Sequence, residues 1–195
     1  MQKIGIMGGS FDPPHKAHLE ISAAAFDFLG LDEIVFVPAF SAPLKPRPHF
    51  AGFEDRLEML RLALEKFGRK HRVLEIERER GGMSYSIDTA EYLKKMFAGA
   101  RLFWIIGADQ LRSLHKWREI GRLSEIVEFA VFQRGAEPLA ENPNLPKNTK
   151  ISRVKFEPMD VSSTQIRLAV KNGEDVSDFV DENVLNYIKD NKLYI

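Results

Sequence analysis

The chain of 195 residues carries 28 lysines and arginines against 28 aspartates and glutamates, so its formal net charge is zero at pH 7. This balance gives no support to a protein that holds a nucleic-acid backbone through excess positive charge. The absence of cysteine excludes disulfides, thiolate metal sites and cysteine nucleophiles, and it favours a cytoplasmic protein. The longest apolar run, LFWIIGA, is far shorter than the roughly 18 residues that indicate a membrane span, so we expect no membrane partner.

Apolar runs and helical spacings alternate along the chain from its first residues. Lys3–Met7 is a short apolar run before two glycines, which is typical of a buried parallel strand. Apolar residues then recur at helical spacing from His18 to Leu29, and the glycine that follows predicts the end of this helix. The segment Pro38–Pro48 carries four prolines and predicts a loop after the second strand, and this loop contains Lys45.

The same alternation continues to the C-terminus. Further strands are expected at Glu33–Pro38, Arg72–Glu77, Arg101–Asp109, Glu128–Arg134 and Arg153–Met159. Further helices are expected from about Phe53 to Phe67, from Ser84 or Ser86 as the cap to Phe97, from the serines after Asp160 to Gly173, and around Glu182–Lys189. This order predicts a single domain, residues 1–195, of the α/β class: a doubly wound parallel sheet with helices on both faces. In such sheets ligands bind beyond the carboxyl ends of the strands.

The segment MGGSFDPPHKAH, Met7 to His18, concentrates chemical groups between the first strand and the first helix. Gly8 and Gly9 lack a Cβ and let the backbone approach a phosphate or a sugar closely. The helix that follows offers unpaired N–H groups and a positive dipole end to an anion. His15 and His18 would add two imidazole donors, although a simpler interpretation has His15 capping the turn and His18 packing in the core.

This segment resembles the GxFDxxHxGH signature of the nucleotidyltransferase superfamily, and VSSTQIR, at residues 161–167, resembles the ISSTxxR element of the same superfamily. The resemblance implies a Rossmann-like nucleotidyltransferase fold in which His15 and His18 line the ATP phosphates as pyrophosphate leaves. The part of the ATP site that it implies at this turn comprises Gly8, Gly9, Ser10 and Phe11. One departure is Ala17, which replaces the glycine that usually precedes the second histidine and whose methyl group could crowd the nucleotide.

The second element predicts an anion site at the start of a helix. There the hydroxyls of Ser163 and Thr164 can hold phosphate oxygens of ATP, and Arg167, one turn further on, presents a guanidinium fork. The alternative is an ordinary serine-capped helix with a solvated arginine. The presence of the histidine motif in the same chain favours the binding site.

Two further segments, SYSIDT and WIIGADQLRSLHKW, resemble those of the nicotinate-nucleotide adenylyltransferase branch of the superfamily. The resemblance implies that Gly107 and Asp109 bind the adenosine ribose of ATP, whereas Asp109 as a plain helix cap is the alternative. It also implies that a nicotinate ring stacks near Trp117, unless that residue is an ordinary core aromatic. The nicotinate mononucleotide site implied in this way comprises Ser84, Tyr85, Ser86, Trp117 and Arg134.

The activity implied by this resemblance is transfer of AMP from ATP to nicotinate mononucleotide. His15, His18, Arg167 and Lys45 would stabilise charge, and Mg²⁺ would arrive with ATP rather than occupy a metal site of the chain. A phosphopantetheine adenylyltransferase or a cytidylyltransferase would share the histidine and serine motifs but should lack the segments of the pyridine site. A nucleotide-binding protein without turnover is the alternative from another class. The sequence leaves open the oligomeric state and the preference between nicotinate and nicotinamide mononucleotide.

Overall fold

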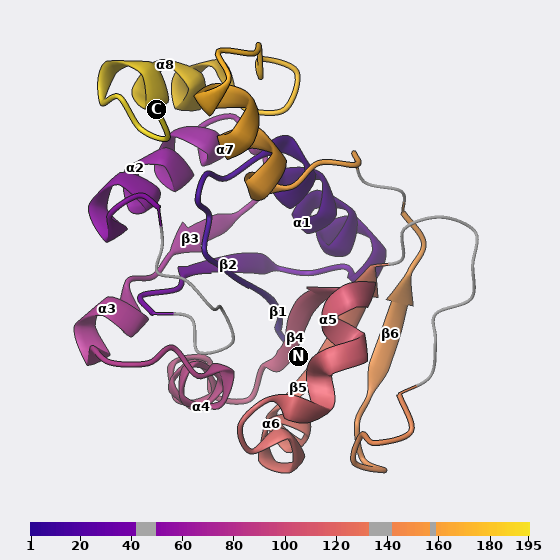
Figure 1. Cartoon of the computed structure of the whole chain (residues 1–195). Coiled ribbons are helices and arrows are strands. Elements are labelled where there is room, and N and C mark those ends of the chain that lie inside the picture. The colour runs from indigo at the N-terminus through magenta and orange to yellow at the C-terminus, as the bar shows by residue number, and fades with distance from the viewer. Residues whose placement is uncertain (42–49, 133–141, 157–158) are drawn as a thin grey trace.

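The computed structural model describes residues 1–41, 50–132, 142–156 and 159–195 of the chain. Within these residues, six parallel strands form one sheet in the order β3-β2-β1-β4-β5-β6 (Figure 1). The strands are β1 (Lys3–Gly9), β2 (Glu33–Pro38), β3 (His71–Val73), β4 (Arg101–Gly107), β5 (Val127–Phe132) and β6 (Ile151–Val154). The prediction of an α/β doubly wound parallel sheet is confirmed.

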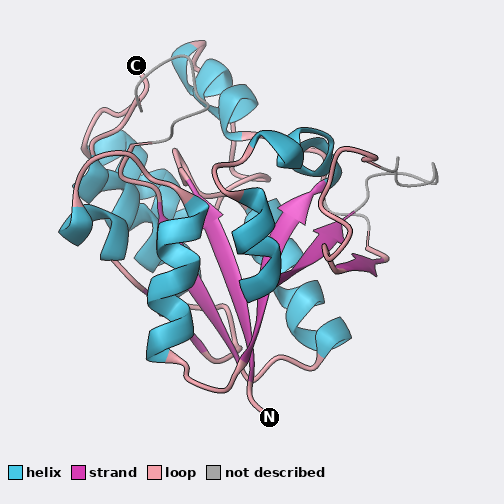
Figure 2. Ribbon diagram, turned by 90° about the horizontal axis from the view of Figure 1, so that it is seen from below, coloured by secondary structure: helices cyan, strands magenta, loops and turns pink. Residues whose placement is uncertain are grey.

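Helices cover both faces of the sheet (Figure 2). The helical elements are α1 (Lys16–Leu29), α2 (Phe53–Leu64), α3 (Ile76–Arg80), α4 (Ser86–Met96), α5 (Ala108–Ser113), the 3-10 turn η1 (Leu114–Lys116), α6 (Ile120–Ile126), α7 (Ser163–Lys171) and α8 (Glu182–Asp190). Helices α1 and α2 pack on one face and α3 to α6 on the other, while α7 and α8 pack against α1 and α2 in a third apolar cluster. Among the described residues, no helix combines the length and the apolar character needed to cross a membrane.

Strands that are apolar on both faces explain this layering. In β4, Leu102, Trp104 and Ile106 point to the cluster under α4 and α6, whereas Phe103 and Ile105 point to the cluster under α1 and α2. Because successive side chains of a strand alternate between faces, a continuous apolar run fills two cores at once. The uninterrupted run LFWII is therefore the sequence of a central strand, with helices on both of its sides.

The strand order reverses its direction of growth between β1 and β4. The chain builds β1, β2 and β3 outward to one side of the sheet, and then places β4, β5 and β6 on the other side. At such a switch point the loops after the two neighbouring strands diverge, and they leave a crevice at the carboxyl edge of the sheet. The turn that follows Gly9 and the start of α5, directly after Gly107, lie at this edge.

The structure corrects several expected boundaries. The expected strand Arg72–Glu77 ends at Val73, and Ile76 begins α3, where its side chain is buried in the cluster under α4. Residues 74 to 76 alternate between apolar and polar side chains, as a strand does. Because β3 is the edge strand and pairs only with β2, the chain can leave the sheet after Val73 and turn toward the cluster under α4. Helices α5 and α6 and the turn η1, between β4 and β5, were not predicted because none of them is longer than seven residues.

Candidate active site

The turn after β1 brings His15 and His18 face to face. Their rings stack with centroids 3.7 Å apart, and the edge of His18 lies against the Phe11 ring. The backbone N–H of His15, the N-cap residue of α1, donates to Nδ1 of His18 at 3.2 Å. Because that ring nitrogen accepts, the proton of the neutral His18 ring lies on Nε2, where it can be donated to another group. The prediction that the two histidines lie together at the start of α1 is confirmed.

The start of α1 is not an open anion site of the kind expected from the sequence. The backbone N–H of Lys16 donates to the carbonyl of Phe179 at 2.8 Å, and that of His18 donates to the carbonyl of His15 at 2.9 Å. The side chain of Lys16 also donates to the carbonyl of Ser177. The segment before α8 therefore covers the first turn of α1.

The two glycines at the end of β1 make room for the protein's own aromatic rings. A Cβ at Gly8 would lie 3.2 Å from the Trp104 ring, and one at Gly9 would lie 3.1 Å from the ring of Phe11. Phe11 itself is 1% exposed, so its ring belongs to the core and only its backbone, at φ +49°, borders the turn. The packing of these rings is therefore one reason for glycine at both positions, and the expected approach of their backbone to a phosphate or a sugar stays a prediction.

Ala17 does not crowd a nucleotide. Its side chain is fully buried in the apolar cluster formed by α1, α2, α7 and α8, which also contains Met59 and Ile166. His15 and His18 stack on each other, whereas Ala17 packs between helices. The methyl group that replaces the usual glycine therefore contributes to helix packing.

Helix α7 approaches the same turn with its first residues. Ser162 caps the helix by accepting from the N–H of Gln165, and the Ser163 hydroxyl donates to the carbonyl of Pro13 at 2.9 Å. Thr164 is exposed beside the guanidinium of Arg167, which donates to its hydroxyl at 3.2 Å. The VSSTQIR and histidine motifs are thus in direct contact although about 150 residues separate them.

Arg167 is directed at the turn by contacts that do not involve the histidines. Its Nη1 donates to the backbone carbonyl of Asp12 at 2.7 Å, and its guanidinium lies 4.2 Å from the centre of the Phe50 ring. A planar guanidinium held in this way keeps a fixed orientation. The prediction that Arg167 lies at the phosphate end of the site is consistent with this placement, while a freely solvated arginine is not.

The buried carboxylate of Asp12 organises this end of the site. Its side chain accepts from the backbone N–H groups of Phe50 at 2.8 Å and Ala51 at 3.1 Å, and from the Tyr194 hydroxyl at 2.9 Å. Arg56, which is 1% exposed, donates to the carbonyl of Ser10 at 2.7 Å. Burial lowers the pKa of this guanidinium, and the nearby Asp12 charge opposes that shift.

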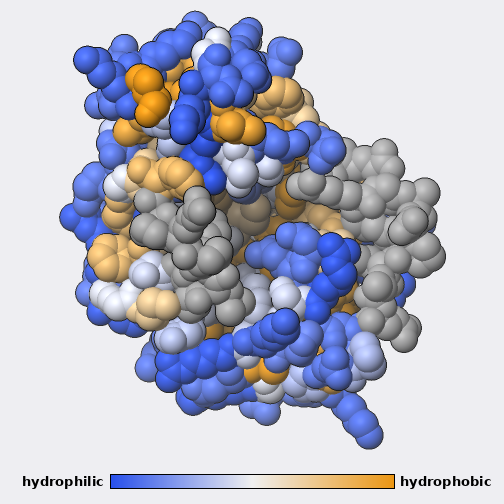
Figure 3. Space-filling model, viewed as in Figure 1, coloured by the Kyte–Doolittle hydropathy of each residue, from blue (hydrophilic) through white to orange (hydrophobic). Residues whose placement is uncertain are grey.

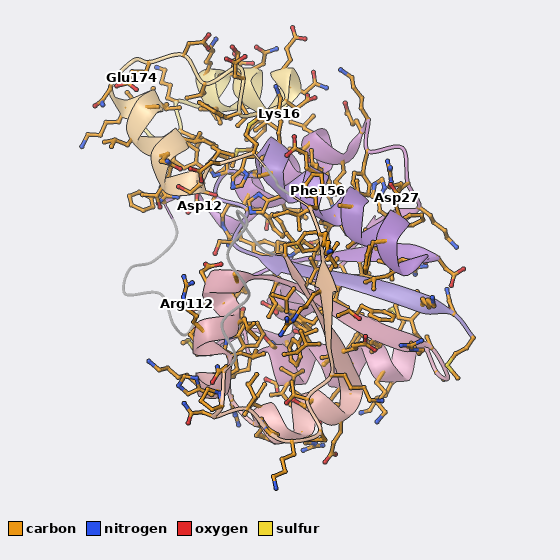
Figure 4. All side chains as sticks on the ribbon, turned by 90° about the vertical axis from the view of Figure 1, so that its right-hand side faces the viewer. Asp12, Lys16, Asp27, Arg112, Phe156 and Glu174 are labelled. Atoms are coloured by element: carbon orange, nitrogen blue, oxygen red, sulfur yellow. The ribbon has the colours of Figure 1, made fainter. Side chains whose placement is uncertain are left out.

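The sequence interpretation missed Asp12, Arg56 and Tyr194. Asp12 stands inside the quoted motif, and that position was the available signal. Arg56 follows the spacing of a helix face otherwise made of apolar residues, whereas nothing local marks Tyr194. Figure 4 shows Asp12 beside α7 at one edge of the sheet and Asp27, near the end of α1, at the opposite edge.

The end of β4 forms the other wall of the crevice. The N–H of Gly107 donates to the side chain of Gln110 at 3.1 Å, which closes the first turn of α5. The exposed carboxylate of Asp109 folds back so far that a Cβ at Gly107 would lie 2.5 Å from it. Asp109 is therefore a residue of the first turn and not the cap of the helix. Viewed from the carboxyl edge, the surface is hollowed between α7 and α5 (Figure 3).

The residues proposed for a pyridine ring gather on the α4 side. Trp117 and Tyr85 are both partly buried on the same apolar cluster, and the Trp117 ring meets Trp104 edge to face at 6.1 Å. Tyr85 precedes the first turn of α4, which begins at Ser86, and the guanidinium of Arg118 lies 4.5 Å from the centre of its ring. This places one aromatic face of each residue at the margin of the core.

Ser84 is bonded to the segment that follows β2. Its hydroxyl oxygen accepts from the backbone N–H groups of Phe40 and Ser41, each at 3.0 Å, so it ties the loop before α4 to the end of β2. Ser84 therefore does not cap α4, and the cap residue is Tyr85. Lys45 and Arg134, two further predicted site residues, lie outside the described residues.

A parallel sheet with its switch point between β1 and β4, together with a histidine turn in contact with a serine-capped helix, defines the chain as a nucleotidyltransferase. The model of the cytidylyltransferase-like family matches residues 6–169. A protein of Opitutus terrae described as a probable nicotinate-nucleotide adenylyltransferase is 40% identical over 192 residues, which cover 98% of this chain and 97% of that protein. The chain belongs to the cytidylyltransferase-like family, and within it to the nicotinate-nucleotide adenylyltransferases.

Solved structures agree on the fold. Two structures of the Plasmodium falciparum nicotinic acid mononucleotide adenylyltransferase, one complexed with NaAD and one with APC, each match with a TM-score of 0.80. They are 20% and 19% identical to this chain, and each match covers 100% of this chain and 98% of the Plasmodium chain. The family and the fold expected from the motifs are confirmed.

Proposed function

We propose that this chain transfers the adenylyl group of ATP to nicotinate mononucleotide, giving nicotinate adenine dinucleotide and pyrophosphate. The observation that carries the proposal is the stacked pair His15 and His18 at the switch point of a parallel sheet. The turn that carries this pair also binds Arg167 through the carbonyl of Asp12. The similarity to the Opitutus terrae protein over almost the whole chain supports the choice of this acceptor.

The phosphate end of the proposed site lies between the β1 turn and α7. There the Nε2 proton of His18 and the imidazole of His15 would donate to phosphate oxygens of ATP, and Arg167 would supply a fixed positive charge. Thr164 is exposed at the start of α7 and would bind a phosphate oxygen, whereas the Ser163 hydroxyl is bonded to Pro13 and would position the helix. We assign Lys45 to the same end as a further cation.

The two nucleosides would occupy opposite sides of this centre. The backbone of Gly107 and the carboxylate of Asp109, with two acceptor oxygens, would hold the paired hydroxyls of the adenosine ribose. On the α4 side, Trp117 would stack on the electron-poor pyridine ring. The backbone N–H groups at the start of α4, around Tyr85 and Ser86, would donate to the nicotinate carboxylate. We propose that Arg134 binds the phosphate of the acceptor nucleotide.

The reaction needs no nucleophile from the protein. An oxygen of the acceptor's 5′-phosphate, already ionised near neutral pH, attacks the α-phosphorus of ATP as the bond from that phosphorus to the bridging β-oxygen breaks. The electron pair leaves with pyrophosphate, so the chain has to align the two phosphates and stabilise the charge that moves onto the leaving group. The histidine pair and Arg167 are placed for the second task.

We propose that Mg²⁺ enters with ATP, as part of the substrate. Among the described residues, no three His, Asp or Glu side chains gather as a group that could hold a metal ion. We therefore assign no step to a metal held by the chain itself. The cytoplasmic location expected from the absence of cysteine stays a proposal.

Pyrophosphate release with ATP and four acceptors in parallel tests the activity: nicotinate mononucleotide, nicotinamide mononucleotide, phosphopantetheine and no acceptor. We expect release with a pyridine mononucleotide only. His18→Ala should lower kcat about a hundredfold, because it removes one donor to the leaving group. His71→Ala, which removes a histidine on the edge strand β3, is the matched control and should leave kcat unchanged. A folded His18→Ala protein with wild-type kcat would contradict the assignment.

A further inference from the structure

The C-terminal end of the chain reaches the catalytic turn. After α8, the backbone N–H of Leu193 donates to the carbonyl of Ile188 at 3.0 Å, which turns the last residues back toward α2 and α7. Tyr194, the penultimate residue, is partly buried there, and its hydroxyl donates to Oδ1 of Asp12 at 2.9 Å. The two residues are 182 positions apart in the sequence.

The hydroxyl of Tyr194 keeps the proton that it donates to Asp12. Burial, followed by the nearby charge of Asp12, raises the pKa of Tyr194, so its hydroxyl keeps its proton. Asp12 is 3% exposed and accepts from the hydroxyl in a setting from which water is largely excluded. A hydrogen bond from a donor to a charged acceptor in such a setting is stronger than one at the surface.

Asp12 is linked to both groups that would bind phosphate. It stands three residues before His15 in the same turn, and its backbone carbonyl accepts from Nη1 of Arg167. The N–H groups of Phe50 and Ala51 hold the same carboxylate from the side of α2. A displacement of Asp12 would therefore move the histidine pair and the guanidinium together. The hydroxyl of Tyr194 is one of the donors that prevent this displacement.

We propose that Tyr194 is a positioning residue for adenylyl transfer, acting through Asp12 on the stacked histidines and on Arg167. This inference rests on the proposed function for its kinetic consequence, but the placement of the histidines can be measured without any substrate. The C-terminal tail is thus part of the active-site architecture, although it touches none of the reacting groups. A purely structural role, as an anchor for the tail, is the alternative that the experiment must exclude.

Tyr187 provides the matched control. It lies in α8, and its hydroxyl donates to Oδ1 of Asp55 in α2 at 3.1 Å. Tyr187→Phe therefore removes one hydroxyl and one hydrogen bond to a carboxylate from the same helical layer, without touching Asp12. A loss of activity that follows from a loosened tail alone would appear in both variants.

The kinetic test compares Tyr194→Phe with Tyr187→Phe. We expect Tyr194→Phe to lower kcat about tenfold, because a small misplacement of the phosphate-binding groups is enough to slow transfer. The KM for the pyridine nucleotide should stay within about twofold of wild type, since its proposed site lies on the α4 side. Tyr187→Phe should leave both constants unchanged. Equal kcat values for the two variants would overturn the proposal.

A double-mutant cycle asks whether Tyr194 acts through Asp12. If it does, Tyr194→Phe should add no further loss of kcat in the Asp12→Asn background, whereas independent effects would multiply. Multiplying effects would overturn the proposed path. Thermal unfolding of each variant identifies any that fails to fold. Histidine NMR of the substrate-free protein tests the placement of the histidines without the Asp12→Asn variant.

Histidine NMR spectra of the substrate-free protein supply that measurement. The ring nitrogens of His15 and His18 report their protonation and hydrogen bonding, and spectra of His15→Ala and His18→Ala assign the signals. We expect Tyr194→Phe to shift or broaden both sets of signals and Tyr187→Phe to leave them in place. Unchanged signals in Tyr194→Phe would overturn the proposal. A wild-type protein without pyrophosphate release would instead refute the proposed function and leave this spectroscopic result interpretable.

Discussion

Replacing Arg56 by methionine tests whether the buried charge beside the turn that carries His15 and His18 stabilises the fold. Arg56 is 1% exposed and donates to the carbonyls of Ser10 at 2.7 Å and Ala51 at 3.3 Å. Methionine has similar length but removes these donors and the positive charge that faces Asp12. Removing one member of a buried charged group costs about 3–5 kcal/mol. For a chain of this size, that corresponds to a Tm lower by roughly 6–20 °C.

The measurement is urea unfolding followed by circular dichroism, in which the midpoint should fall by about 1–2 M at an unchanged m value. The control is Arg61→Met in the same helix. The Arg61 side chain is 53% exposed, and its partner Glu75 lies at 2.8 Å. Because exposed pairs contribute little, this control should cost less than about 1 kcal/mol. If the two variants unfold at the same urea concentration, Arg56 does not carry the stability assigned to it.

Two further outcomes are expected. Trp117→Ala should raise the KM for the pyridine nucleotide about tenfold or more relative to the KM for ATP, because it removes the proposed stacking surface. The measurement is steady-state kinetics with each substrate varied in turn. Equal changes of the two KM values would show that Trp117 only packs in the core. The raised pKa of Tyr194 means that, above roughly pH 10, the unfolded chain loses this proton before the folded chain does, so folding stability falls as pH rises. In thermal unfolding, the stability advantage of wild type over Tyr194→Phe should therefore shrink above that pH, whereas parallel curves for the two proteins would contradict the pKa shift.

Long apolar segments were predictable because the residues that define each of them are neighbours in the sequence. The run LFWII in β4, the helical spacing in α1 and the glycine after it carry their structural meaning within a few residues. The site motifs were predictable for the same reason, since each is contained in a single loop and the adjoining turn of a helix. Short elements such as α5 and α6 were not, because seven residues or fewer do not display a helical period.

The order of the apolar runs and the histidine and serine motifs determined the doubly wound sheet, the family and the end of the sheet at which the candidate site lies. The tertiary structure decided what each side chain does there. It packed Trp104 and Phe11 against Gly8 and Gly9, buried Ala17 between helices, and brought Tyr194 to Asp12. These outcomes depend on contacts between distant segments. The sequence pattern of one element contains no information about which partner will cover it.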